Sequence, residues 1–209
     1  MPEIHAHDRL AFRIFYPAIR VFGRCLLFIF GPVKTVGLEN IPKTGGALII
    51  ANHLSNLDPV AIKASCNRPI CYLSKRELFG NPVGAGIIRW FGAFPIDRDA
   101  PDRKALQYAA KLIQEGHLVC IFPEGKLSES GELLPIQPGF TLIARIAKCP
   151  MITCRVKNTD AVMPYAKVFP RMSFKRIIVT WNEPIPAEMA KQTDELLERI
   201  KKELSPVLD

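Results

Sequence analysis

A histidine and an aspartate, His53 and Asp58, stand close together directly after an apolar run at residues 47–51. A carboxylate that holds the Nδ1 hydrogen of an imidazole fixes one tautomer and raises the basicity of the ring, so that Nε2 can take a proton from an alcohol. In one regular helix the two side chains would point ~140° apart, so the chain must bend between them if they are to meet. The pair therefore predicts a general base whose reaction partner is an alcohol.

The residues around this pair predict a strand, a loop and the start of a helix. The apolar, β-branched run at 47–51 follows two glycines and favours a buried strand. Pro59 suits the first turn of a helix and disfavours the α region at Asp58, which suits an N-cap. His53 then lies on a loop and Asp58 at the mouth of a helix. The alternative is purely structural: Asp58 only caps that helix and His53 bonds a backbone carbonyl.

Charged residues follow three further apolar runs that predict strands, at 69–74, 92–96 and 118–121. These residues are Lys75, Arg98, Glu124 and Lys126. In open α/β sheets, ligands bind outside the carboxyl ends of the strands. We therefore expect these side chains to converge with the histidine in one crevice.

The order of these blocks resembles the glycerolipid acyltransferase family, and within it the 1-acylglycerol-3-phosphate acyltransferases. His53 and Asp58 match the HX4D block, residues 92–98 match the block with an arginine, and Phe-Pro-Glu-Gly at 122–125 matches the third block. Pro150 matches a weaker fourth block. HX4D alone is common by chance, whereas HX4D and FPEG in this order, with the arginine block between them, are specific. The resemblance covers residues 47–154.

The resemblance implies transfer of a fatty acyl group from acyl-coenzyme A or acyl carrier protein, as co-substrate, to the sn-2 hydroxyl of 1-acylglycerol 3-phosphate, giving phosphatidic acid. His53 would be the base and Asp58 would orient it. Arg98 and Lys75 would bind the acceptor phosphate, with Lys126 as a third candidate. Glu124 would bond an acceptor hydroxyl or order the loop that Gly125 permits. Neither a metal nor a tightly bound cofactor is implied.

One departure keeps other acceptors open. The third block of the family usually continues with threonine, arginine and serine, whereas Lys126, Leu127 and Ser128 follow Gly125 here. A lysine supplies positive charge without the bidentate fork of a guanidinium. The alternatives are an acyltransferase acting on glycerol 3-phosphate or another lysolipid, a thioesterase in which His53 activates water, and a non-catalytic membrane-binding protein.

Composition limits the partners. The 209 residues are 48% hydrophobic, enough for one domain with a sizeable core. A net charge of +8 favours an anionic partner, and no nucleic-acid-binding pattern accompanies it. None of the six cysteines forms a CxxC pair, so neither a zinc site nor a disulfide framework is indicated. We expect buried, reduced cysteines and a protein on the cytoplasmic side of a membrane.

The N-terminal segment, residues 8–33, interleaves arginines with apolar and aromatic residues. Its longest uncharged run, at 25–33, is shorter than the ~20 residues needed to span a bilayer, and Arg24 interrupts any signal-peptide core. The pattern predicts a basic amphipathic helical pair, broken near Pro17, that lies in the headgroup plane as a peripheral or monotopic anchor. The alternative is a helix packed on the core. We divide the chain into this segment, residues 1–36, and an acyltransferase domain, residues 37–209.

The rest of the chain alternates between strand and helix patterns. Further strands are predicted at 151–156 and 177–181, and helices at 101–116, with Asp99 as a cap, at 140–147 and at 191–204. Such alternation predicts an α/β fold with a mostly parallel central sheet flanked by helices, preceded by the amphipathic membrane-binding helical segment.

Overall fold

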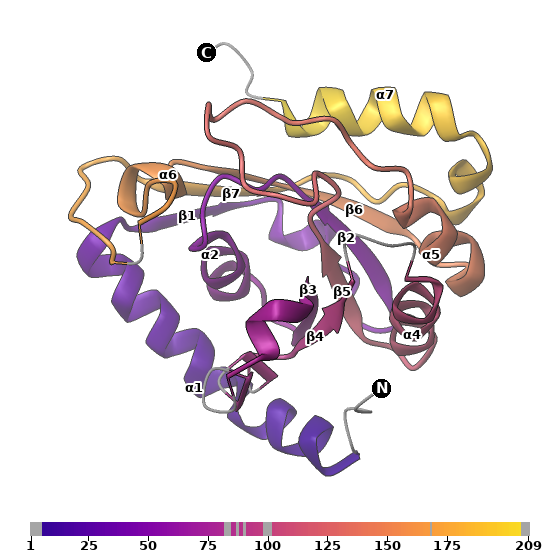
Figure 1. Ribbon diagram of the computed structural model, residues 1–209, viewed down its shortest axis with the longest axis horizontal. Coiled ribbons are helices and arrows are strands. Elements are labelled where there is room, and N and C mark those ends of the chain that lie inside the picture. The colour runs from indigo at the N-terminus through magenta and orange to yellow at the C-terminus, as the bar shows by residue number, and fades with distance from the viewer. Residues whose placement is uncertain are drawn as a thin grey trace.

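The computed structural model describes residues 6–81, 85–86, 88–89, 91–97, 102–167 and 169–205. A seven-stranded sheet runs through the molecule in the order β1-β7-β6-β2-β5-β3-β4, with helices on both faces (Figure 1). The strands are β1 (Val33–Val36), β2 (Ala47–Ala51), β3 (Ile70–Lys75), β4 (Ala93–Ile96), β5 (Leu118–Ile121), β6 (Met151–Lys157) and β7 (Ile177–Trp181). Within the described residues, neighbouring strands are parallel except for β6 and β7. The predicted mostly parallel α/β sheet is confirmed.

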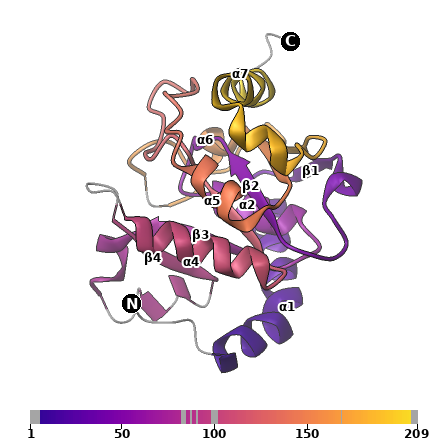
Figure 2. The ribbon, with the colours of Figure 1, turned by 90° about the vertical axis from the view of Figure 1, so that its right-hand side faces the viewer.

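The helices pack in two cores, one on each face of the sheet. They are α1 (Ala6–Phe30), α2 (Asp58–Ser65), α4 (Arg103–Gln114), α5 (Phe140–Ala147), α6 (Thr159–Val162) and α7 (Thr193–Leu204), with 3-10 turns at Leu38–Asn40, Arg76–Phe79 and Ala187–Lys191. Figure 2 views the molecule with α4 and α5 toward the reader. All of β2 is buried. Because its side chains alternate, Ile49 packs in one core with α1 and α2, and Ile50 packs in the other with α4, α5 and α7.

The chain leaves neighbouring strands β2 and β5 toward opposite faces of the sheet. β2 continues into α2 on one face, and β5 leads through a long loop to α5 on the other. In an open α/β sheet a crevice forms where the connections diverge in this way. The residues that follow β2 and β5 therefore face each other at this edge.

Several local predictions are wrong. α1 is one helix with Pro17 inside it, rather than a pair broken there. Packing of α1 against the domain through Tyr16, Ile19 and Leu27 outweighs the hydrogen bond that proline lacks. The cap of α4 is Asp102, whose carboxylate accepts from the amide of Ala105 at 3.0 Å. Asp99, the predicted cap, lies outside the described residues.

The segment before residue 37 also contains a strand that the sequence pattern did not suggest. β1 is short, alternates between half-buried and exposed residues, and pairs with β7 at the edge of the sheet. The division at residue 36 stays a prediction. Within the residues described, none of the helices combines the length and apolar character needed to cross a bilayer.

A buried lysine lies where α1 packs on α2. Lys63 is 2% exposed, and its ammonium donates to the carbonyl of Phe91. The Nζ atom lies 5.1 Å, 5.4 Å and 5.7 Å from the ring centroids of Phe91, Tyr72 and Tyr16. These ring faces favour the ammonium. Burial opposes it more strongly and lowers the pKa of Lys63 to about 7.

Replacement of this lysine should change how stability depends on pH. Because folding lowers the pKa of Lys63, the unfolded chain binds the proton more tightly, and the free energy of unfolding rises with pH between about 7 and the usual lysine pKa near ~10.4. Lys63→Met removes this term. Urea unfolding under reducing conditions should show the wild type gaining on the variant by at most about 1.4 kcal/mol per pH unit over that window. Lys202→Met, at an exposed position of α7, is the control, and identical pH profiles for wild type and Lys63→Met would exclude the effect.

Candidate active site

A buried carboxylate holds the turn that follows β2. Asp58 Oδ2 accepts from His53 Nδ1 at 2.9 Å and from the backbone amides of Leu54 at 2.7 Å and Ser55 at 2.8 Å. Oδ1 accepts from the hydroxyl of Thr159, the first residue of α6. Asp58 is fully buried, and four donors compensate the desolvation of its charge. The predicted bend between histidine and aspartate is present.

The predicted capping of α2 by Asp58 is wrong. Asp58 is the first helical residue, Leu57 occupies the N-cap position, and no side chain caps the helix. The carboxylate points back to the amides of the preceding turn instead. It therefore orders the loop that carries the histidine rather than the helix that follows.

The imidazole is fixed in its tautomer and in its plane. An ionised carboxylate can only accept, so Nδ1 carries the hydrogen toward Asp58 and Nε2 is the basic nitrogen. The ring stacks on Phe122 with centroids 3.9 Å apart and an interplanar angle of 16°. Tyr72 stacks behind Phe122 at 6.5 Å. The His53 side chain is 11% exposed, so a reactant reaches it through a narrow opening.

Glu124 fastens the loop after β5 to the same turn. Its Oε1 accepts from the backbone amide of His53 at 2.7 Å, and its Oε2 accepts from the amide of Leu134 at 2.8 Å. Burial raises the pKa of Glu124, while these two amides act in the opposite direction. The amide of Ser128 donates to the His53 carbonyl at 2.9 Å. Gly125 permits this path because its φ is +72°, in the left-handed region.

The two described cations that were predicted to bind a phosphate are exposed at their side chains. Lys75, at the end of β3, is half exposed and lies 3.8 Å from Glu77. Lys126 is exposed on the loop after β5. Arg98 lies outside the described residues. The structure therefore brings His53, Asp58 and Glu124 together, and places Lys75 and Lys126 after the ends of β3 and β5.

Ser55 is the hydroxyl residue of the turn between His53 and Asp58. Its hydroxyl donates to the carbonyl of Met163 at 2.7 Å and accepts from the amide of Leu57 at 3.1 Å. Backbone groups therefore engage this oxygen both as a donor and as an acceptor. These contacts indicate that Ser55 is a structural residue of the turn rather than a nucleophile.

Sequence reasoning missed the residues that hold the turn from outside. Thr159 approaches Asp58 from a distant part of the chain, and Asn52 bonds both the amide and the carbonyl of Val156, at 2.7 Å and 2.9 Å. No local pattern marks either residue. The hydroxyl of Ser128 is buried and has no hydrogen-bond partner among the described residues. In the sequence, the place of Ser128 three residues after Gly125 was the signal that could have pointed to this residue.

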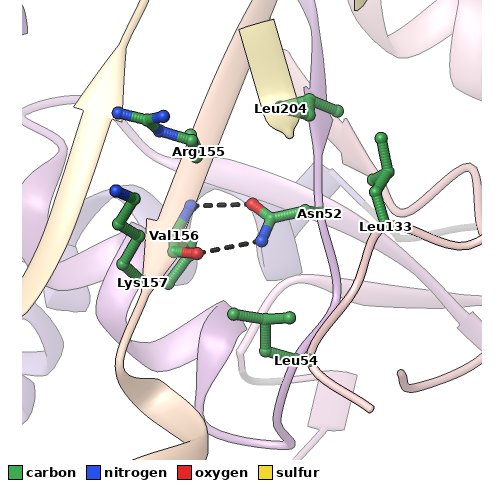
Figure 3. A pocket seen from close by; sticks show the side chains of 8 residues that line it. Asn52, Leu54, Leu133, Arg155, Val156, Lys157 and Leu204 are labelled. Carbon is green, nitrogen blue, oxygen red and sulfur yellow. Dashed lines mark hydrogen bonds between the residues drawn. The ribbon is translucent and has the colours of Figure 1, made fainter. Parts of the chain in front are cut away.

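A small pocket lies beside the turn (Figure 3). Asn52, the residue directly after β2, lines this pocket, and His53 does not. Two basic side chains and three leucines are among its lining residues, which are Asn52, Leu54, Gly131, Leu133, Arg155, Val156, Lys157 and Leu204. The chemistry of the His–Asp pair, rather than this pocket, defines the candidate active site. Among the described residues, three or more metal-ligating side chains do not gather at any point.

Comparisons with known proteins agree with this geometry. A sequence model described as "Acyltransferase" matches residues 32–157. A 1-acyl-sn-glycerol-3-phosphate acyltransferase of Bacillus subtilis is 29% identical over 197 residues, covering 89% of this chain and 94% of that protein. A protein of the same name from Streptococcus pneumoniae is 27% identical, covering 90% of this chain and 69% of its own length.

A similar fold occurs in a solved structure. The crystal structure of the 1-acyl-sn-glycerophosphate (LPA) acyltransferase PlsC from Thermotoga maritima superposes with a TM-score of 0.73 and 24% sequence identity. The match covers 90% of this chain and 78% of that one. At this identity the likeness establishes the fold.

Replacement of Glu124 by glutamine should loosen the turn. A carboxylate accepts from both amides, whereas a carboxamide has one acceptor oxygen and would leave the His53 or Leu134 amide without an acceptor. We expect Glu124→Gln to lower the free energy of unfolding by about 1–3 kcal/mol. Glu132→Gln, at an exposed position of the same loop, is the control. Equal denaturation midpoints for the two variants would show that the Glu124 contacts contribute nothing to stability.

Proposed function

The chain belongs to the acyltransferase family, and we propose that it transfers a fatty acyl group from an acyl thioester to the sn-2 hydroxyl of 1-acylglycerol 3-phosphate, giving phosphatidic acid for phospholipid biosynthesis. The observation that carries the proposal is the buried pair of His53 and Asp58, with Nε2 left as the base. The names of the two bacterial relatives, both 1-acyl-sn-glycerol-3-phosphate acyltransferases, support the choice of acceptor.

The reaction uses direct attack by the acceptor. His53 Nε2 takes the hydroxyl proton while the oxygen attacks the thioester carbon, and a base in this position contributes roughly 10²–10⁴-fold. Asp58 stabilises the imidazolium that forms. As the tetrahedral intermediate collapses, the C–S bond breaks and the imidazolium returns the proton to the leaving thiolate. The new C–O ester bond remains, and the free thiol departs.

The acceptor phosphate requires cations near this edge of the sheet. We assign this task to Arg98 first, Lys75 second and Lys126 third. The side chains of Lys75 and Lys126 are exposed, which suits a headgroup that arrives from outside the domain. Coenzyme A and acyl carrier protein both present the acyl group as a thioester, so either serves the mechanism as donor.

The exposed side of α1 supports a peripheral position on the cytoplasmic side of a membrane. One side of the helix packs on α2 and carries Gly23, where an added Cβ would lie 3.6 Å from Val60. The other side exposes a stripe of apolar residues: Val21, Phe22, Cys25, Phe28 and Ile29. Helical geometry places these five residues within about one third of the circumference. Apolar side chains at this spacing suit insertion at the headgroup level.

Loss of the base should abolish acyl transfer without loss of the fold. We expect His53→Ala to reduce the rate of diacyl product formation from 1-acylglycerol 3-phosphate and palmitoyl-coenzyme A by roughly 10²–10⁴-fold. Asp58→Asn should also be severely impaired, because an amide can present its NH₂ group to Nδ1 and favour the wrong tautomer. Mass spectrometry of the product avoids interference from the free cysteines.

The control is His117→Ala, which removes a histidine from the turn between α4 and β5. It should keep wild-type turnover. Release of free fatty acid by the wild type, with no diacyl product, would favour the thioesterase. If the wild type turned over only glycerol 3-phosphate, or only a larger lysolipid, that molecule would replace 1-acylglycerol 3-phosphate as the assigned acceptor. Binding of vesicles without turnover on any of these acceptors would favour a non-catalytic protein.

A further inference from the structure

The connection between β6 and β7 exposes large apolar side chains. We call the described residues 163–167 and 169–176 the β6–β7 segment. Phe169 is 84% exposed, Met172 74% and Phe174 fully exposed, and Tyr165 is 44% exposed. Bulky side chains gathered in this way on a soluble surface mark a site of interaction.

The backbone of this segment is fixed although its apolar side chains are exposed. The amide of Arg171 donates to the carbonyl of Val162, and the amide of Ser173 donates to the carbonyl of Phe30, both at 2.8 Å. Asn158 Nδ2 donates to the carbonyl of Arg176 at 2.7 Å. The segment is thus tied at both ends and in its middle. Its exposed side chains belong to an ordered surface.

Positive charge is interleaved with these apolar residues. The exposed cations of the segment are Lys167, Arg171, Lys175 and Arg176, and residues 163–176 contain neither aspartate nor glutamate. A nucleic acid would also meet this charge, but it offers no apolar phase for four bulky side chains. Anionic headgroups above an acyl layer match both parts of the pattern.

The segment joins the catalytic turn to the end of α1. The carbonyl of its first residue, Met163, accepts a hydrogen bond from the hydroxyl of Ser55 in the catalytic turn. Near its middle, the amide of Ser173 bonds the carbonyl of Phe30, the last residue of α1. In Figure 1 the segment lies at the left, next to the end of α1. The segment is therefore tied at its start to the turn that carries His53 and in its middle to the end of α1.

We propose that the β6–β7 segment is a second membrane anchor, which inserts Phe169, Met172 and Phe174 at the headgroup level of an anionic bilayer. The cations of the segment contact the lipid phosphates, and the catalytic turn is held near the membrane. Presentation of the turn to a membrane-bound acceptor rests on the proposed function. Insertion of the segment into a bilayer does not depend on that function.

The test measures binding of the full chain to vesicles by sedimentation. Phosphatidylcholine vesicles with phosphatidylglycerol should bind the wild type, and pure phosphatidylcholine vesicles should bind it more weakly. We expect Phe169→Ser/Phe174→Ser to lower the partition coefficient by roughly tenfold or more. Lys175→Glu should lower it as well, with a smaller effect at high salt. Ile146→Ser on α5 and Lys202→Glu on α7 are the matched controls and should bind like the wild type.

Because the substituted side chains are exposed, the variants should keep the wild-type melting temperature. Wild-type partitioning of both Phe169→Ser/Phe174→Ser and Lys175→Glu would overturn the proposal. A wild-type dimer that dissociates in the double phenylalanine variant, seen by light scattering without vesicles, would assign the surface to a second copy instead. Activity on a soluble short-chain acceptor without vesicles should be unchanged in the double variant. If the wild type binds vesicles through the segment but shows no turnover, the proposed acyl transfer is wrong and the proposed membrane insertion is supported.

Discussion

The hydrogen bonds to the carboxylate of Asp58 determine the geometry of the whole catalytic edge. One oxygen accepts from an imidazole and two backbone amides, and the other accepts from Thr159. A fully buried charge is tolerated only while its donors are in place, so the carboxylate and its donors fix each other's positions. The turn is therefore closed by the same group that orients the imidazole of His53. Structural and chemical requirements meet in one side chain.

The two acidic residues at this edge have different tasks because their surroundings differ. Asp58 lies beneath the turn and contacts the imidazole directly. Glu124 comes from the neighbouring strand end, and its hydrogen bonds among the described residues are to the backbone amides of His53 and Leu134. The first orients the ring, and the second keeps the two strand ends together. This division follows from the topology, since β2 and β5 are neighbours whose connections leave toward opposite faces.

Elements with a strong local signal were predictable from the sequence. The apolar runs that form β2 and β5 are buried over their full length, and the block from His53 to Pro59 indicated a bend. Features that depend on distant partners were not predictable. Thr159 reaches Asp58 across a long stretch of chain, and the stacking of Phe122 on the imidazole depends on strand order. The prediction for Arg98 has no observed contact to be compared with, because this residue lies outside the described residues.

The packing around Lys63 has a consequence for the evolution of the N-terminal helix. Tyr16 of α1 covers this lysine from one side and Tyr72 covers it from another, and Tyr72 belongs to the stack of rings that ends on the imidazole. An anchor that is merely appended to an enzyme can be lost or exchanged between relatives without harm to the catalytic domain. α1 does not have this independence. Removal of α1 would take away the Tyr16 ring that covers the buried ammonium of Lys63, and it would expose one side of the domain core. Sequence changes in the helix and in the domain must therefore occur together.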